Sequence, residues 1–154
     1  MAKIHDPVAN ELELVITRMF DAPRELVWKA WTESERVLQW LGPSGFTATE
    51  FKLDPSPGGR WHSRMHDPDG KVYANRGIVH EAIEPERMEF TFAWDNDDGT
   101  PGRQMLISIE LEDRNGKTQM TFRQAEFESR DDRDGHNDGW SQSFDKLAFY
   151  LSTQ

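Results

Sequence analysis

Residues 140–151, WSQSFDKLAFYL, place apolar side chains at intervals of three and four residues. This spacing predicts an amphipathic helix of about fifteen residues that begins at Trp140. The apolar stripe along it consists of Trp140, Phe144, Leu147, Ala148 and Leu151. A stripe of this kind has to be covered by another layer of the protein, so the rest of the chain must supply an apolar surface.

The central part of the chain supplies that surface as a series of short strands separated by turn-forming residues. Asn115-Gly116 is a strong signal for a hairpin turn. Within Arg87–Trp94, alternate residues are apolar while Glu89 and Thr91 are polar, so we expect a sheet with one polar face. The expected strands are Thr47–Leu53, Arg60–His66, Val72–Ile83, Arg87–Trp94, Arg103–Glu112 and Lys117–Phe127.

The flanking segments complete the expected architecture. Glu11–Phe20 is a first strand, and Arg24–Gln39 forms two short helices, the second started by a capping box of Thr32 and Glu35. The acidic stretch Ser129–Gly139 is expected to be a loop before the long helix. The sequence therefore predicts an α+β fold, in which a curved antiparallel sheet of about seven strands wraps around the C-terminal helix.

Length and charge exclude several classes of function. The 154 residues suffice for one domain with a substantial core, so we expect a single domain over residues 1–154. A net charge of -10 repels nucleic-acid phosphates and anionic lipids, and the lack of cysteine excludes thiolate chemistry. Neither a signal peptide in Met1–Asn10 nor a membrane span elsewhere is visible, so a cytoplasmic location is expected.

A set of residues along nearly the whole chain carries a family resemblance. The set includes Arg18, Phe20, Ala22 and Pro23; Val27, Trp28, Ala30, Trp31 and Trp40; Gly58, Gly59 and Arg60; Pro68, Asp69 and Gly70; Gly77 and Glu81; Pro85, Glu86, Arg87, Phe90 and Thr91; and His136, Gly139, Trp140, Leu147, Ala148 and Leu151. With the order of elements, this set resembles the START-like helix-grip superfamily of polyketide cyclases, aromatases and lipid-transfer proteins. Within it, the chain is most similar to the activator homologues of the heat-shock chaperone ATPase.

The resemblance implies a helix-grip fold with an apolar pocket between helix and sheet, and a heat-shock chaperone as a possible partner. The eukaryotic activators join the homologous module to a separate chaperone-binding domain. We therefore rank chaperone activation behind ligand binding. Either a monomer or a homodimer is compatible with the sequence.

Aromatic and methionine side chains are the candidates for a ligand-binding wall. Aromatic faces offer a large contact area at low entropic cost, and methionine adapts to irregular shapes. The alternative for each residue is a place in an ordinary core. The candidate ligand-binding residues are Trp40, Trp61, Met65, Phe92, Trp94, Met105, Phe122, Trp140 and Phe144.

An enzymatic hypothesis uses His136 and Glu81. A histidine near the pocket mouth and a carboxylate in an apolar hollow would suit proton transfer, as in a cyclase or aromatase. The alternative is that His136 packs on the start of the helix and that Glu81 binds Arg76 or Arg87.

We expect no metal site and no cofactor. His62, Arg64 and His66 share a strand face, but the two histidines are separated by roughly 13 Å along an extended strand, too far for one ion. The chain has no Gly-x-Ser-x-Gly elbow and no nucleotide-binding fingerprint. The leading hypothesis is therefore the binding of a small hydrophobic molecule.

Overall fold

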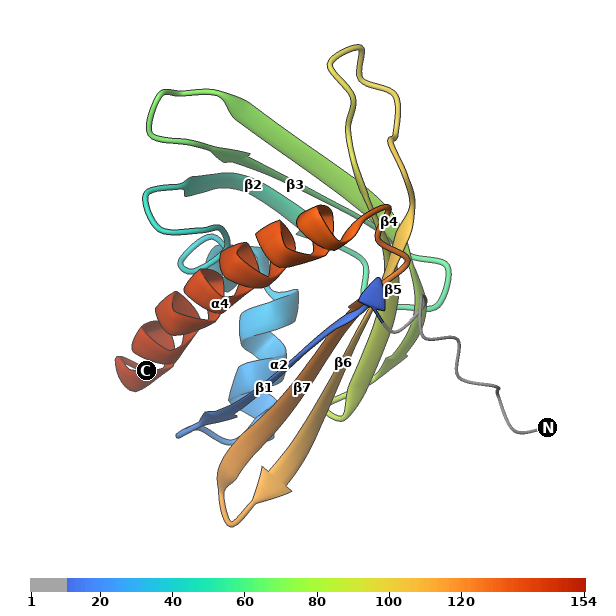
Figure 1. Ribbon diagram of the computed structural model, residues 1–154. Helices are drawn as coiled ribbons and strands as arrows, with labels where there is room; N and C mark the ends of the chain where they lie inside the picture. The colour runs from blue at the N-terminus through green and yellow to red at the C-terminus, as the bar shows by residue number, and fades with distance from the viewer. Residues whose placement is uncertain (1–10) are drawn as a thin grey trace, which may run out of the picture.

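The computed structural model describes residues 11–154. The prediction that residues 1–10 hold no signal peptide lies outside the described residues. Seven strands form one antiparallel sheet in the order β1-β7-β6-β5-β4-β3-β2 (Figure 1). The strands are β1 (Leu14–Phe20), β2 (Thr47–Leu53), β3 (Arg60–His66), β4 (Val72–Ile83), β5 (Arg87–Trp94), β6 (Met105–Arg114) and β7 (Lys117–Ala125).

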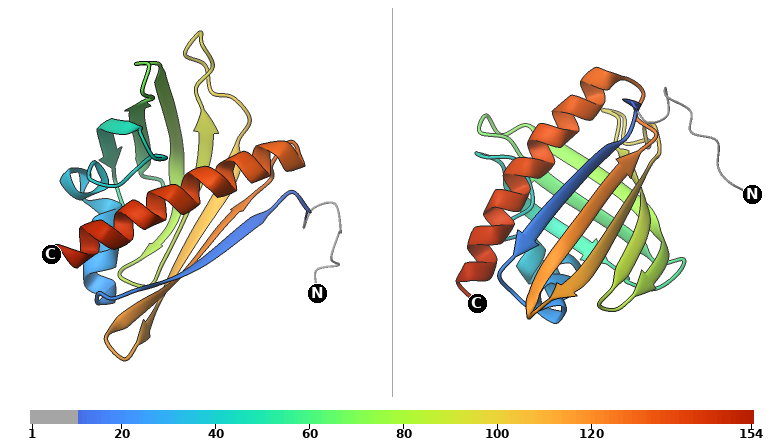
Figure 2. Two further views of the ribbon diagram at one scale, coloured as in Figure 1. Left: turned by 60° about the vertical axis from the view of Figure 1, so that its left-hand side comes forward. Right: turned by 60° about the horizontal axis from the view of Figure 1, so that its bottom comes forward.

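The sheet curls around one long helix, α4 (Arg130–Ser152), which crosses its concave side (Figure 2). At 1.5 Å per residue, this helix is about 35 Å long and can span the sheet. The α+β helix-grip architecture predicted from the sequence is confirmed. Four strands, β2 to β5, have the predicted bounds, while the predicted Arg103–Glu112 strand is shifted by two residues.

The start of α4 differs from the prediction. The stretch Ser129–Gly139 is not a loop, because the helix already begins at Arg130. The Ser129 hydroxyl caps it by accepting a hydrogen bond from the Asp132 backbone N–H at 3.1 Å. Asp131 and Asp132 also lie in the first turn, where their negative charge is favoured by the helix dipole.

Two short helices follow β1, as predicted, and they are α2 (Arg24–Thr32) and α3 (Ser34–Val37). The predicted capping box of Thr32 and Glu35 is wrong. Thr32 belongs to the end of α2, where its hydroxyl donates to the Trp28 carbonyl at 2.9 Å, so it is not free to cap α3.

The sheet alternates between a buried and a more polar face, and β6 shows this most clearly. Met105, Ile107, Ile109 and Leu111 are buried, and the residues between them are more exposed. The pairing register shifts between Ala48 and Glu50 and between Val79 and Glu81, and such bulges bend a strand. In the part of the chain that the structure describes, no helix is long and apolar enough to cross a membrane.

The helices do not cover the concave face evenly. α2 packs against β6 and β7, and α4 packs against β1. Side chains there form a dense core that includes Phe20, Trp28, Ile107, Phe122 and Phe144. The half of the sheet made by β2 to β5 has less helix directly upon it, and this difference creates the site described next.

Candidate functional site

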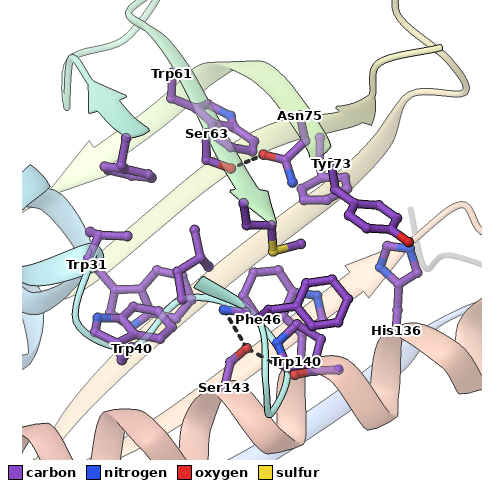
Figure 3. Close-up of a pocket in the computed structure, with 18 of the residues that line it drawn as sticks. Trp31, Trp40, Phe46, Trp61, Ser63, Tyr73, Asn75, His136, Trp140 and Ser143 are labelled. Atoms are coloured by element: carbon purple, nitrogen blue, oxygen red, sulfur yellow. Dashed lines mark hydrogen bonds between the residues drawn. The ribbon is translucent and has the colours of Figure 1, made fainter. Parts of the chain in front are cut away.

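A cavity of about 220 Å³ lies between the β2–β5 half of the sheet and α4 (Figure 3). The wall of the cavity is formed by strands β2 to β5, by the segment from Val37 to Phe46 and by one face of α4. That wall is almost entirely apolar, and the cavity is partly open to solvent.

Six of the nine ligand-binding candidates line this cavity, and they are Trp40, Trp61, Met65, Phe92, Trp94 and Trp140. Met105, Phe122 and Phe144 do not line it. These three lie in the core, where Phe122 and Phe144 pack against Trp31 of α2. Because α2 covers the β6–β7 half of the sheet, inward-facing side chains there contact protein instead of free space.

Several residues of the wall were not identified from the sequence. Trp31, Phe46, Tyr73 and Phe90 add aromatic surface, while Ser63 and Asn75 add polar groups. The alternation in β3 already placed Ser63 on the same face as Trp61 and Met65, so a signal for this residue existed. Phe90 likewise shares a strand face with Phe92 and Trp94.

A polar cluster joins α4 to the sheet at one end of the cavity. The Trp94 indole donates to Nε2 of His136 at 3.0 Å, and His136 Nδ1 donates to Oε1 of Gln124 at 3.1 Å. The Trp140 indole donates to the same oxygen at 2.8 Å. Gln124 is fully buried and was not identified from the sequence, because a glutamine within a strand carries no distinctive pattern.

His136 lines the cavity and is held as a neutral side chain. Burial lowers the pKa of His136 to about 4, and the nearby Asp132 carboxylate offsets part of this effect. Because the Trp94 indole donates to Nε2, the proton of the neutral ring resides on Nδ1. The lone pair of the neutral ring lies on Nε2 and already accepts the hydrogen bond from Trp94, so His136 is poorly suited to accept a proton from a ligand.

Glu81 lies on the opposite face of the sheet. It accepts a hydrogen bond from Nε of Arg87 at 3.2 Å and is paired in register with Glu89. The bulge between Val79 and Glu81 moves Glu81 to that face and turns the next residue, Ala82, toward Met88. The structure therefore does not bring His136 and Glu81 together.

The His62, Arg64 and His66 strand face is polar and paired with β2. His62 Nε2 lies 2.7 Å from Oε1 of Glu50, and His66 Nε2 lies 3.1 Å from the Thr49 hydroxyl. The contact with His62 also lowers the pKa of Glu50. Among residues 11–154, no three His, Cys, Asp or Glu side chains gather where they could hold a metal ion.

Side chains of α4 hold the loop that closes one side of the cavity. The Gly42 N–H donates to the Ser143 hydroxyl at 3.1 Å (Figure 3), and Lys146 Nζ donates to the Gly42 carbonyl at 3.0 Å. The Ser44 N–H donates to Oε1 of Gln142 at 2.9 Å. Three successive contacts thus fix this loop to the helix.

One buried polar pair faces the apolar wall from the sheet. Ser63 of β3 and Asn75 of β4 are direct cross-strand partners, with 2% and 5% of their surface exposed. The Ser63 hydroxyl donates to Oδ1 of Asn75 (Figure 3). The sequence alone does not distinguish such a pair from surface residues, because both residue types are usually exposed.

Comparisons with known proteins agree with this fold. The family model for activator of Hsp90 ATPase homolog 1-like proteins matches residues 21–152. An AHSA1 protein from Silicibacter pomeroyi is 26% identical, with a TM-score of 0.84 over 92% of this chain and 98% of that one. A protein from Chromobacterium violaceum is 26% identical, with a TM-score of 0.82 over 91% of this chain and 96% of that one. A protein from Nitrosomonas europaea is also 26% identical, with a TM-score of 0.78 over 93% of this chain and 96% of that one. Among proteins with curated descriptions, none matches significantly.

Proposed function

The chain belongs to the family of activator of Hsp90 ATPase homolog 1-like proteins, and within this frame we propose that it binds a small hydrophobic or aromatic molecule between α4 and the β2–β5 half of the sheet. The observation that carries the proposal is the apolar cavity of about 220 Å³. The family's helix-grip fold is compatible with ligand binding at this place.

The size and chemistry of the cavity support a small ligand. Protein interiors are normally close-packed, and an apolar cavity of about 150 Å³ is already large enough to bind benzene. Several aromatic rings around one space can contact a flat molecule from more than one side, among them Trp31, Trp61, Phe90 and Trp140. A ligand of one or two rings fits these dimensions better than a long lipid chain.

The site supports binding more than it supports catalysis. The cyclase-like hypothesis required His136 and Glu81 to act on one molecule, but His136 lines the cavity from α4 and Glu81 lies on the face of the sheet turned away from the cavity. Among the described residues of the wall, the one histidine is neutral, with both ring nitrogens engaged.

Direct titration with a small bicyclic arene tests the proposal. We expect saturable quenching or shift of tryptophan fluorescence, since several indoles line the cavity. Leu53→Trp should weaken binding because Leu53 lines the cavity and a larger ring occupies its volume. Val15→Trp is the matched control, because Val15 is 48% exposed on an outer strand. Equal affinity in both variants and the wild type would contradict binding at this site.

A second candidate function is an interaction with a heat-shock chaperone, and the name of the matched family favours it. This candidate predicts that the purified chain stimulates the ATPase activity of an Hsp90 from the same organism. Unchanged ATPase activity, together with no co-purification of the chaperone, would exclude it. Ligand binding and chaperone binding are separable, because Leu53→Trp should affect only the former.

A further inference from the structure

We propose that the ligand is an uncharged molecule with one hydrogen-bond acceptor, such as a ketone, aldehyde or ester on a small ring system, and that Nδ2 of Asn75 donates to this acceptor. The inference rests on the proposed function and specifies which chemical class the cavity selects. It follows from the charges of the wall and from a complete account of its polar side chains.

The absence of charge from the wall restricts the ligand. Among the described residues that line the cavity, none is Asp, Glu, Lys or Arg. The one ionisable histidine, His136, is neutral at physiological pH, since its pKa lies at about 4. A charged ligand group would lose its hydration without gaining an opposite charge, and this loss strongly disfavours binding. The cavity therefore selects neutral molecules.

Nearly all polar side chains of the wall already have partners within the protein. The indoles of Trp40 and Trp61 donate to the carbonyls of Ala30 and Thr91, at 3.0 and 2.8 Å. The Tyr73 hydroxyl donates to Oδ2 of Asp67 at 3.3 Å. Trp94, Trp140, His136 and Ser143 are engaged in the contacts described above. None of these donors is free for a ligand.

Two residues of the described wall, Trp31 and Asn75, carry a polar group without a partner, and of these two only the amide of Asn75 faces free space. Its Oδ1 accepts a hydrogen bond from the Ser63 hydroxyl, and within residues 11–154 its Nδ2 has no partner. In that same range, Trp31 Nε1 is the only fully enclosed side-chain nitrogen or oxygen without a partner. The Asn75 Nδ2 is therefore not enclosed by protein, and Figure 3 shows the amide on the cavity wall.

An unpaired amide N–H in an apolar wall discriminates between ligands. A ligand with an acceptor at this position gains a hydrogen bond, whereas a pure hydrocarbon leaves the N–H unsatisfied and removes its access to water. At Nδ2 itself, a ligand that only donates would meet an N–H and gain no hydrogen bond. The wall thus favours a carbonyl at one point and hydrocarbon elsewhere.

Four probes built on a bicyclic ring system test this inference: indane without a polar group, 1-indanone with an acceptor, indole with a donor, and indane-2-carboxylate with a negative charge. Each is titrated into the wild type, Asn75→Leu and Asn96→Leu. Asn96 lies in an exposed loop and undergoes the same exchange, so it is the matched control. We expect Asn75→Leu to weaken 1-indanone binding about three- to tenfold and to leave indane within about twofold. Asn96→Leu should change neither, and indane-2-carboxylate should not bind measurably.

A measurement on the wild type makes the test independent of whether Asn75→Leu folds. In a ¹⁵N-labelled protein, the side-chain NH₂ signals of Asn75 should shift with 1-indanone and far less with indane. The double variant Ser63→Ala/Asn75→Leu removes both partners of the pair, so no buried hydroxyl is left without its acceptor.

The outcomes separate this inference from the proposed function. If no probe binds the wild type, the proposed function fails, and the inference fails with it. If indane and 1-indanone bind but Asn75→Leu affects them equally, the cavity binds ligands and the role of Asn75 is wrong. If Asn75→Leu weakens indole instead, the amide presents its oxygen and the acceptor class is overturned. Tight binding of the carboxylate would contradict the selection for neutral ligands.

Discussion

His136 is an ionisable residue that the fold holds in its neutral form, and stability should therefore depend on pH. The pKa of His136 is about 4 in the folded state, because burial disfavours the charged ring, and about 6.5 when unfolded. The unfolded state thus binds a proton first as the pH falls. We expect the free energy of unfolding to be unaffected above pH 7 and to fall by about 1 kcal/mol between pH 6 and pH 5.

Denaturant titrations at pH 5, 6 and 8 measure this effect, and His136→Gln is its control. Glutamine retains hydrogen-bonding groups but does not titrate, so the variant should lose the slope between pH 6 and pH 5. Hydrogen bonds lower the pKa of Glu50, Asp67 and Asp98, so these carboxylates stay ionised through that range. An identical slope in wild type and variant would assign it to other groups.

Gly77 is required by a close approach of β4 to β5. A Cβ at this position would overlap the Thr91 carbonyl oxygen, which also accepts the Trp61 indole N–H at 2.8 Å. We expect Gly77→Ala to destabilise the fold by at least about 2 kcal/mol, because backbone atoms must move apart. Urea denaturation measures the change. A shift below about 0.5 kcal/mol would mean that the strands separate at little cost.

At the scale of elements, the first half of α4 carries a glycine that the helix does not need. Gly135 is exposed, and a Cβ there would meet no atom within 4 Å. Alanine is a better helix former than glycine by about 1 kcal/mol, so Gly135→Ala should raise the free energy of unfolding by about that amount. Thermal unfolding monitored by circular dichroism measures it.

Gly116 is the matched control for this exchange. A Cβ added there would likewise meet no atom within 4 Å, but the φ of 86° is strained for any residue with a side chain. Gly116→Ala should therefore destabilise by about 1 kcal/mol. The same direction of change in both variants would show that helix propensity is not the cause.

The same half of α4 explains why its start was mispredicted. Between Arg130 and Gly139 the residues are mostly charged or glycine, so no apolar stripe marks the helix there. The available signal was Ser129 followed three residues later by Asp132, which is a capping pattern. The C-terminal half was predictable because Phe144, Leu147 and Leu151 are buried on one face.

At the scale of the whole molecule, strand alternation predicted which side chains point inward but not which of them meet free space. Phe92 and Phe122 both face the concave side, yet only Phe92 lines the cavity, because α2 covers the strand that carries Phe122. The position of α2 depends on long-range packing that no local pattern records. The bulge between Val79 and Glu81 could not be predicted from the sequence either, and it determines the face of the sheet on which Glu81 lies.

The pairing of β1 with β7 has a consequence for the order of folding. Leu14 faces Gln124 in the register, whereas β5, β6 and β7 pair with their neighbours in the sequence. Closing a loop of roughly a hundred residues costs more entropy than closing a hairpin, so β1 should join last. Pulsed hydrogen exchange during refolding measures this order, and we expect the amides of β6 and β7 to become protected before those of β1. Simultaneous protection of all three strands would contradict it. Until β1 pairs with it, β7 is an edge strand with unpaired backbone N–H and C=O groups, and a strand of a second, partly folded chain could pair with these groups.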